Sequence, residues 1–236
     1  MQYTYLVPAI ACTIWLAVNP SATAQIVPDA TLPNPSTIRL EESLLKITGG
    51  SQAGSNLFHS FEQFNVRAGE TVYFDNAPNL DAIVTRVTGG QISNIDGLLR
   101  TNGTANVFLI NPSGIVFGPQ AQLDIGGSFF ASSAESLRFA DGTEFSATQP
   151  NTTPLLSINV PIGLQYGPTP GTIASRANLS VSPGQTLALL GGTLALDRSQ
   201  LTTFDGQIAL GSIAGEGRIQ FADWTSTGQL GSITLT

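Results

Sequence analysis

The sequence predicts an all-β protein in which short strands are stacked, and three observations indicate this fold class. Only 11% of the 236 residues are charged and 25 are glycine, unlike helical bundles, which are rich in Lys, Glu and Ala. Short β-branched and aromatic segments alternate with Gly, Asn, Asp or Pro, and no 3.6-residue periodicity is evident from about residue 36 onward. A fixed spacing also recurs in the C-terminal third, as stacked repeats require.

The chain begins with an apolar segment typical of an export signal. Residues 5–18, YLVPAIACTIWLAV, are apolar and are followed by an A-x-A cleavage site at Ala22 and Ala24. The segment is short for a membrane span, which needs about 20 apolar residues. We therefore expect residues 1–24 to be a cleaved signal peptide, and the mature chain to carry no transmembrane segment as it passes through the periplasm.

Strand-like segments follow one another through the middle of the chain. Asp141-Gly142, between two of these segments, is a hairpin signal. Strands at this spacing are compatible with a sandwich, a barrel or a β-solenoid. The segments are TVYFDN (71–76), AIVTRVTGG (82–90), NVFLINPSG (106–114), IVFG (115–118), GSFFASSA (127–134) and SLRFADGTEF (136–145).

Repeats in the C-terminal third favour the solenoid. Gly184-Gln185, Gly206-Gln207 and Gly228-Gln229 recur at a spacing of 22 residues, and Leu179 and Leu201 have the same spacing. A fixed period of roughly 20 to 50 residues is the mark of stacked repeats. Twenty-two residues are enough for three short strands and three corners, which make one coil of a parallel β-helix.

The most sharply specified turn is Asn111-Pro112-Ser113-Gly114, between two short apolar segments. Asn at the first position can bond the backbone ahead, Pro at the second presets φ, Ser is tolerated at the third, and Gly suits the fourth. We therefore predict a type I turn that joins two strands at a corner.

Composition excludes several classes of function. A formal net charge of −7 with only nine Lys and Arg residues argues against nucleic acid as a partner, because such affinity comes largely from basic side chains. Cys12 would leave with the signal peptide, and His59, the only histidine, is expected to be packed among its apolar neighbours. No Ser–His pair, Cys–His pair or zinc site can then be assembled. We expect neither enzymatic activity nor a cofactor or metal.

Residues 56–134 resemble the N-terminal secretion domain of filamentous haemagglutinin-type exoproteins, the two-partner secretion family, and within it the large exoproteins of cyanobacteria. Asn111-Pro112-Ser113-Gly114-Ile115 matches the motif N-P-N-G-I with Ser in place of the second Asn. The second motif, N-P-N-L, is best matched by Ala77-Pro78-Asn79-Leu80, where Ala77 takes the place of Asn. Residues 179–196 resemble the coils that follow the motif region.

The resemblance implies a right-handed, single-stranded parallel β-helix with an N-terminal cap and a small extra-helical β-hairpin. Residues 25–165 would form the secretion domain, with the cap and first coils. Residues 166–236 would continue the coils and end within one, as expected of a truncated chain. The Pro-rich stretch 149–171 is expected to be an irregular excursion between the two parts.

The resemblance also implies a function. The chain would present an exported adhesin-like exoprotein to an outer-membrane TpsB-type transporter, whose periplasmic POTRA domains would recognise it, and would fold at the cell surface. While extended, a strand such as Thr71–Phe74 could pair with a sheet edge of that partner. Surface receptors or glycans of host or neighbouring cells would be further partners. A free-standing surface or matrix protein that binds glycans or cells by itself remains the alternative.

Overall fold

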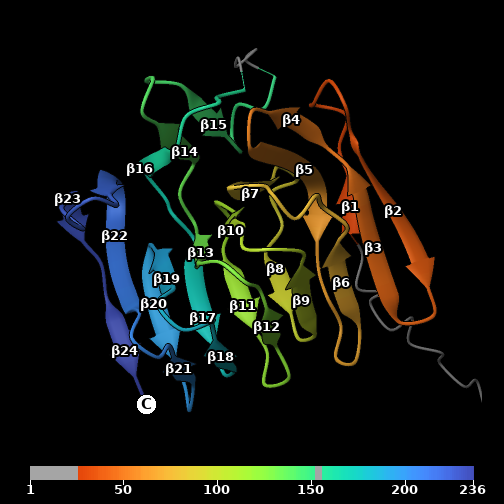
Figure 1. The fold of residues 1–236 in the computed structure, drawn as a ribbon. Helices are drawn as coiled ribbons and strands as arrows, with labels where there is room; N and C mark the ends of the chain where they lie inside the picture. Colours follow the sequence, from red (N-terminus) through yellow and green to blue (C-terminus); the bar gives the residue numbers. More distant parts are fainter. Residues whose placement is uncertain (1–25, 152–155) are drawn as a thin grey trace, which may run out of the picture.

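The computed structural model describes residues 26–151 and 156–236, which form a parallel β-helix built of strands and turns (Figure 1). No α-helix occurs within these two ranges. The all-β prediction and the prediction of a solenoid are therefore confirmed. The predicted signal peptide, with Ala22 and Ala24, lies outside the described residues.

Three faces of parallel strands make up the β-helix. The longest contains β5 (Asn56–Phe64), β7 (Ala82–Val87), β10 (Asn106–Ile110), β13 (Phe129–Ser132), β19 (Thr186–Gly191) and β22 (Gln207–Gln220). The second contains β8 (Ser93–Ile95), β11 (Ile115–Phe117), β17 (Thr172–Ser175), β20 (Thr193–Leu196) and β24 (Ile233–Leu235). The third contains β3 (Leu44–Gly49), β6 (Thr71–Phe74), β9 (Leu98–Thr101) and β12 (Gln122–Asp124), followed by the pair β18 (Asn178–Ser180) and β21 (Gln200–Thr202).

Both faces of the longest sheet are buried, which explains why its strands are apolar at nearly every position. On the inner face, Ile83, Val107 and Phe129 are aligned across β7, β10 and β13 inside the β-helix. On the outer face, the neighbouring residues Val84 and Phe108 belong to a second apolar cluster outside the tube. Burial of the outer face needs a further layer of chain, which the strands outside the β-helix provide.

The N-terminal end is closed by antiparallel strands, as the predicted cap requires. Strands β1 (Ile26–Pro28) and β4 (Ser51–Ala53) pair antiparallel with β5, and β2 (Ser36–Glu41) pairs antiparallel with β3. Such strands end the repeating parallel pattern, and β2 carries charged side chains that discourage further pairing at its edge.

The extra-helical hairpin is present but belongs to a larger sheet. Strands β14 (Ser136–Phe139) and β15 (Glu144–Ser146) are joined at Asp141-Gly142, where Gly142 has a φ of 84°. Strand β16 (Pro161–Tyr166) pairs with β14 and with the end of β22, which also pairs with β23 (Ser226–Leu230). The prediction that 149–171 is irregular is therefore wrong for β16. This strand is regular because Leu164 and Tyr166 cover the outer apolar cluster.

The 22-residue repeat is confirmed in one strand pair and wrong in another place. Leu179 pairs with Leu201, as the repeat predicts. Thr186, however, pairs with Gln207, a spacing of 21 residues. Gly228-Gln229 lies in β23, which runs antiparallel to β22 outside the tube. The third copy of the repeat is therefore not a coil position, because the β22–β23 hairpin is inserted before the chain returns to the coil in β24.

Candidate functional site

The predicted turn lies at the corner between β10 and β11. The Gly114 N–H donates to the Asn111 carbonyl over 2.9 Å, and the Ser113 N–H donates to Asn111 Oδ1 over 3.0 Å. Neither Pro112 nor Ser113 has a positive φ, which excludes a type II turn and agrees with type I. The local geometry predicted from the tetrapeptide is therefore present.

The Asn111 side chain also joins this turn to the preceding coil. Its Nδ2 donates to the Gln91 carbonyl over 2.8 Å and to Ser93 Oγ over 2.9 Å, and the residue is fully buried. Its backbone N–H donates to the Ser132 carbonyl in the following coil over 2.9 Å. Asn111 thus connects three successive coils, a role that the local sequence did not indicate.

The other residues of the motif fix the corner against the next coil. The Pro112 carbonyl accepts a hydrogen bond from the Gly171 N–H over 2.9 Å. Gly114 has a φ of 115°, and a Cβ there would lie 2.5 Å from the Thr172 carbonyl oxygen, so only glycine fits. Ile115 is buried in the inner core, while Ser113 is half-buried.

The second motif lies at a different corner, between β6 and β7. Ala77, Pro78 and Asn79 are exposed, with Pro78 and Asn79 in a turn, and Leu80 is buried in the inner core. The structure therefore does not bring the two motifs together at one corner.

An amide pair that the sequence analysis missed holds this second corner. The Asn102 backbone N–H donates to Asn76 Oδ1 over 2.9 Å, and Asn76 Nδ2 donates to the Asn102 carbonyl over 3.0 Å. Asn102 Nδ2 in turn donates to the Asn76 carbonyl over 3.0 Å. Asn76, directly before Ala77, thus forms hydrogen bonds with the next coil. Asn111 forms the corresponding hydrogen bonds with the preceding coil. In the sequence, the feature that could have indicated this pair is an Asn shortly after each of two strands, β6 and β9, which pair with each other.

The strand Thr71–Phe74 has no free edge in the folded protein. It forms β6, which pairs with β3 on one side and β9 on the other. The expectation that this strand pairs with a partner can therefore apply only to the chain before it folds.

A buried arginine forms the most extensive polar network that the sequence analysis missed. Arg86 is only 1% exposed. Its Nε donates to Ser60 Oγ over 2.8 Å, and one terminal nitrogen donates to the Ser146 carbonyl over 2.6 Å. The other terminal nitrogen donates to Thr31 Oγ1 over 2.8 Å and to the Pro150 carbonyl over 3.2 Å. One side chain therefore ties the N-terminal segment, β5 and the extra-helical chain together.

Asp29 supplies the negative charge next to this network. Burial lowers the pKa of Arg86 to about 10, and the Asp29 carboxylate partly offsets this effect. Burial by itself would raise the pKa of Asp29, but hydrogen bonds from Thr31, Thr88 and Ser60 outweigh it and hold the pKa below its ordinary value. Both groups are therefore charged at neutral pH.

His59 is packed inside the cap end of the β-helix, as its apolar neighbours predict. Its Nδ1 lies 2.8 Å from Ser36 Oγ, and its ring lies against Phe61 and Phe74. Its Nε2 and the hydroxyl of Thr85, the residue paired with it on β7, are buried without partners among the described residues. Burial lowers the pKa of His59 to about 4.

We predict that the cap loses stability as the pH falls from about 6.5 towards 4. The unfolded chain binds a proton at His59 near pH 6.5, whereas the folded chain resists it to about pH 4, so the folded state is penalised progressively across this window. The loss should approach about 3 kcal/mol. Urea unfolding at pH 7 and pH 4.5 measures it. The variant His59→Gln should show a clearly smaller difference, and an equal difference would contradict the assignment.

No group of three His, Cys, Asp or Glu side chains in residues 26–151 and 156–236 is placed to hold a metal ion. In the same two ranges there is no helix that is both long and apolar enough to span a membrane.

Comparisons with known proteins place this fold in a family. The sequence matches the family model "TPS secretion domain" over residues 24–233. A comparison with curated proteins gives no significant match. Among solved structures, the chain is similar to the HMW1 secretion domain from Haemophilus influenzae, with a TM-score of 0.62 and 22% identity, covering 88% of this chain and 50% of that one. It is also similar to the filamentous hemagglutinin secretion domain, with a TM-score of 0.53 and 18% identity, covering 88% of this chain and 68% of that one.

At these identities the solved structures support the fold, and the chain spans about half the length of the HMW1 secretion domain. The family model matches residues 24–233, which include the cap strands and both motif corners. The chain therefore belongs to the TPS secretion domain family.

Proposed function

We propose that this chain is the secretion-recognition domain of an exported adhesin-like or haemagglutinin-like exoprotein. Its partner would be an outer-membrane TpsB-type transporter, which recognises the chain through periplasmic POTRA domains. The observation that carries the proposal is the family match over residues 24–233. The corner at Asn111–Ile115 supports it, because the motif residues there have defined structural roles.

The contacts of Asn111 suggest how folding could accompany export. Its hydrogen bonds reach Gln91 and Ser93 in the preceding coil and Ser132 in the following one. The full set of hydrogen bonds forms only when three coils are in place. Asn111 therefore stabilises the β-helix fully only after these coils have stacked in order. Repeat proteins can fold by adding such units from one end. Folding outside the cell would then favour forward movement of the chain. No step in this scheme requires catalysis.

The finer assignments belong to the same proposal. Residues 1–24 would direct export to the periplasm, 25–165 would contain the cap and first coils, and 166–236 would continue the β-helix. The boundary at residue 165 falls within β16, so the two parts would share one extra-helical sheet. The mature protein would act at the outer cell surface, where receptors or glycans are further candidate partners. Placement among the cyanobacterial large exoproteins stays a prediction.

A secretion assay with the cognate transporter tests the function. We expect the wild-type chain to reach the medium only when the transporter is co-expressed, and Asn111→Ala to remain largely in the periplasm. The matched control is Ser113→Asn, which restores the family's residue at the third turn position and should be secreted like the wild type. Secretion of the wild type without the transporter would contradict the proposal and favour the free-standing adhesin.

A further inference from the structure

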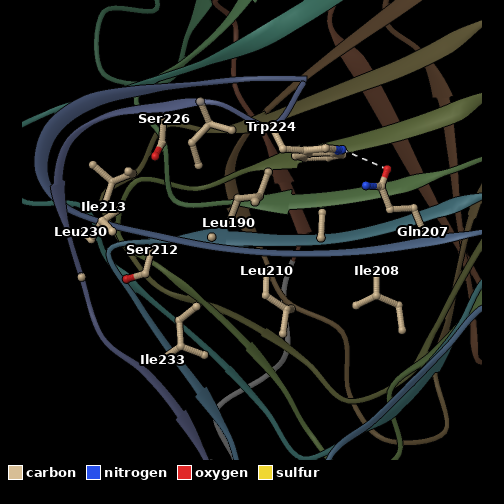
Figure 2. Close-up of a pocket in the computed structure, with 14 residues that line it drawn as sticks. Leu190, Gln207, Ile208, Leu210, Ser212, Ile213, Trp224, Ser226, Leu230 and Ile233 are labelled. Atoms are coloured by element: carbon tan, nitrogen blue, oxygen red, sulfur yellow. Dashed lines mark hydrogen bonds between the residues drawn. The ribbon is translucent and has the colours of Figure 1, made fainter. Parts of the chain in front are cut away.

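A chemically labile pair of residues lies at a corner of the β-helix. The groove beside β22 has no acidic, basic or thiol side chain among the described residues that line it, and there Trp224 Nε1 donates to Gln207 Oε1 over 2.9 Å (Figure 2). The corner after β9, in contrast, contains Asn102-Gly103, the only Asn-Gly pair in the 236 residues. Asparagine is a thermolabile residue, and it is most labile before glycine, which has no Cβ to shield its backbone nitrogen. The chemistry to consider at this corner is therefore spontaneous deamidation.

The stacking of the coils requires glycine at this corner. Gly103 has a φ of 67°, which residues with a side chain rarely adopt. A Cβ on Gly103 would lie 2.2 Å from the Pro78 carbonyl oxygen in the preceding coil. On the other side, a Cβ on Gly126 in the next coil would lie 2.1 Å from the Gly103 carbonyl oxygen. The coils thus pack backbone against backbone here, so no residue less labile than glycine can follow Asn102.

The folded protein uses every polar group of Asn102. Its backbone N–H, its carbonyl and its side-chain Nδ2 each form a hydrogen bond with Asn76. The fourth group, Oδ1, accepts a hydrogen bond from the Tyr73 hydroxyl over 2.9 Å. Asn76 itself is buried. The side chain and backbone of Asn102 are therefore held in one orientation, mainly by Asn76.

Deamidation of this pair begins when the Gly103 nitrogen attacks Asn102 Cγ. The Cγ–Nδ2 bond breaks, and ammonia leaves with the proton that the Gly103 nitrogen gives up. Water then opens the cyclic imide at either of its carbonyls, which gives aspartate or isoaspartate. The attack requires the Asn102 side chain and the following peptide bond to turn towards each other, and Nδ2 must leave its acceptor. The hydrogen bonds to Asn76 oppose both movements.

We propose that Asn102-Gly103 is a deamidation site that is open in the unfolded chain and closed in the folded β-helix, with Asn76 as the residue that closes it. The product does not fit the corner. Nδ2, which donates to the Asn76 carbonyl over 3.0 Å, becomes a carboxylate oxygen that can only accept. Isoaspartate also adds a methylene to a backbone that packs between Pro78 and Gly126. A chain that stays unfolded thus loses the ability to complete this corner, whatever its role in secretion.

Peptide mass spectrometry after incubation at mildly alkaline pH tests the proposal, because it measures the conversion of Asn102 from amide to acid. The purified wild-type chain is incubated folded in buffer and unfolded in guanidinium chloride. Two hydrogen bonds of ordinary strength correspond to at least about tenfold in rate, so we expect the unfolded chain to be converted faster by at least that factor. Equal rates in the two states overturn the proposal.

The variant Asn76→Ala identifies the residue that closes the site. It removes the partners of the Asn102 backbone N–H and carbonyl, so conversion in the folded chain should rise about tenfold. The matched control is Asn111→Ala, which removes a similar set of hydrogen bonds at another corner and should leave the rate at Asn102 unchanged. Equal acceleration by both variants would mean that Asn102 reacts through general unfolding, which overturns the role of Asn76.

Circular dichroism establishes that the compared variants are folded. Asn76→Asp keeps the oxygen that accepts from the Asn102 N–H, so it should be converted at an intermediate rate, and it replaces Asn76→Ala if that variant does not fold. Refolding measures the effect of the product. Wild-type chains converted in guanidinium chloride should regain the native circular dichroism in lower yield than chains kept for the same time at mildly acidic pH. Full recovery of the converted chains would contradict the misfit of the product at this corner.

Discussion

Replacing Arg86 by methionine is expected to lower the free energy of unfolding by about 3 to 5 kcal/mol, the usual cost of removing one partner from a buried charged network. The substitution leaves the Ser146 and Pro150 carbonyls without their donor. It also leaves the Asp29 carboxylate without the positive charge beside it. The guanidinium further lies 4.2 Å above the Phe145 ring, a contact that methionine replaces only in part. Urea unfolding monitored by circular dichroism measures the change.

The matched control is Arg100→Met. Arg100 forms an exposed ion pair with Asp124 over 3.2 Å, and such pairs contribute about 0 to 1 kcal/mol. A third variant, Arg86→Lys, separates charge from geometry. Lysine keeps the charge but cannot direct hydrogen bonds to four acceptors in different directions, so it should lose most of the stability that methionine loses. Equal effects of Arg86→Met and Arg100→Met would show that the buried network does not hold the cap and the extra-helical chain together.

The sequence could predict what is encoded locally. The turn at Asn111–Gly114 follows from the preferences of four adjacent residues, and the two hydrogen bonds within the turn are as expected. The hairpin at Asp141-Gly142 follows in the same way from two residues. The solenoid followed from a spacing that the pairing of Leu179 with Leu201 confirms. Each of these features depends on neighbouring residues or on one repeated distance.

Contacts between distant segments could not be predicted. Arg86 stands in an ordinary strand sequence, and it is buried only because Ser146 and Pro150, 60 and 64 residues later, cover the outer face of the sheet. The amide pair of Asn76 and Asn102 depends on which corners are stacked, which a single sequence does not reveal. Gly228-Gln229 kept the right spacing but lies in a hairpin, because periodicity carries no information about strand direction.

Replacing Asn111 should separate its two roles, which are to form the turn and to join neighbouring coils. In Asn111→Ala, the Gln91 carbonyl and Ser93 Oγ lose a donor and the Ser113 N–H loses an acceptor. The bond to Ser93 is buried, and the bonds to Gln91 and Ser113 are partly buried. A buried group left without its partner costs about 1 to 3 kcal/mol, and we expect a total loss of about 3 kcal/mol in the free energy of unfolding. Asn111→Asp keeps the oxygen that accepts from Ser113 but removes the Nδ2 donors, and it places a carboxylate in a fully buried position.

If the bonds between coils carry the effect, Asn111→Asp should destabilise the protein at least as much as Asn111→Ala, and most strongly at neutral pH, where the aspartate must be charged or take up a proton. If the turn bond alone mattered, Asn111→Asp would still be destabilised by its buried carboxylate at neutral pH, but it would be nearly as stable as the wild type at a pH where that carboxyl is protonated. Ser113→Ala is the matched control, since Ser113 contributes only its backbone N–H to the turn, and its unfolding free energy should change by less than about 0.5 kcal/mol. A stable Asn111→Asp variant would therefore make this residue a turn former only, and the stacking of the three coils would have to depend on the strands themselves.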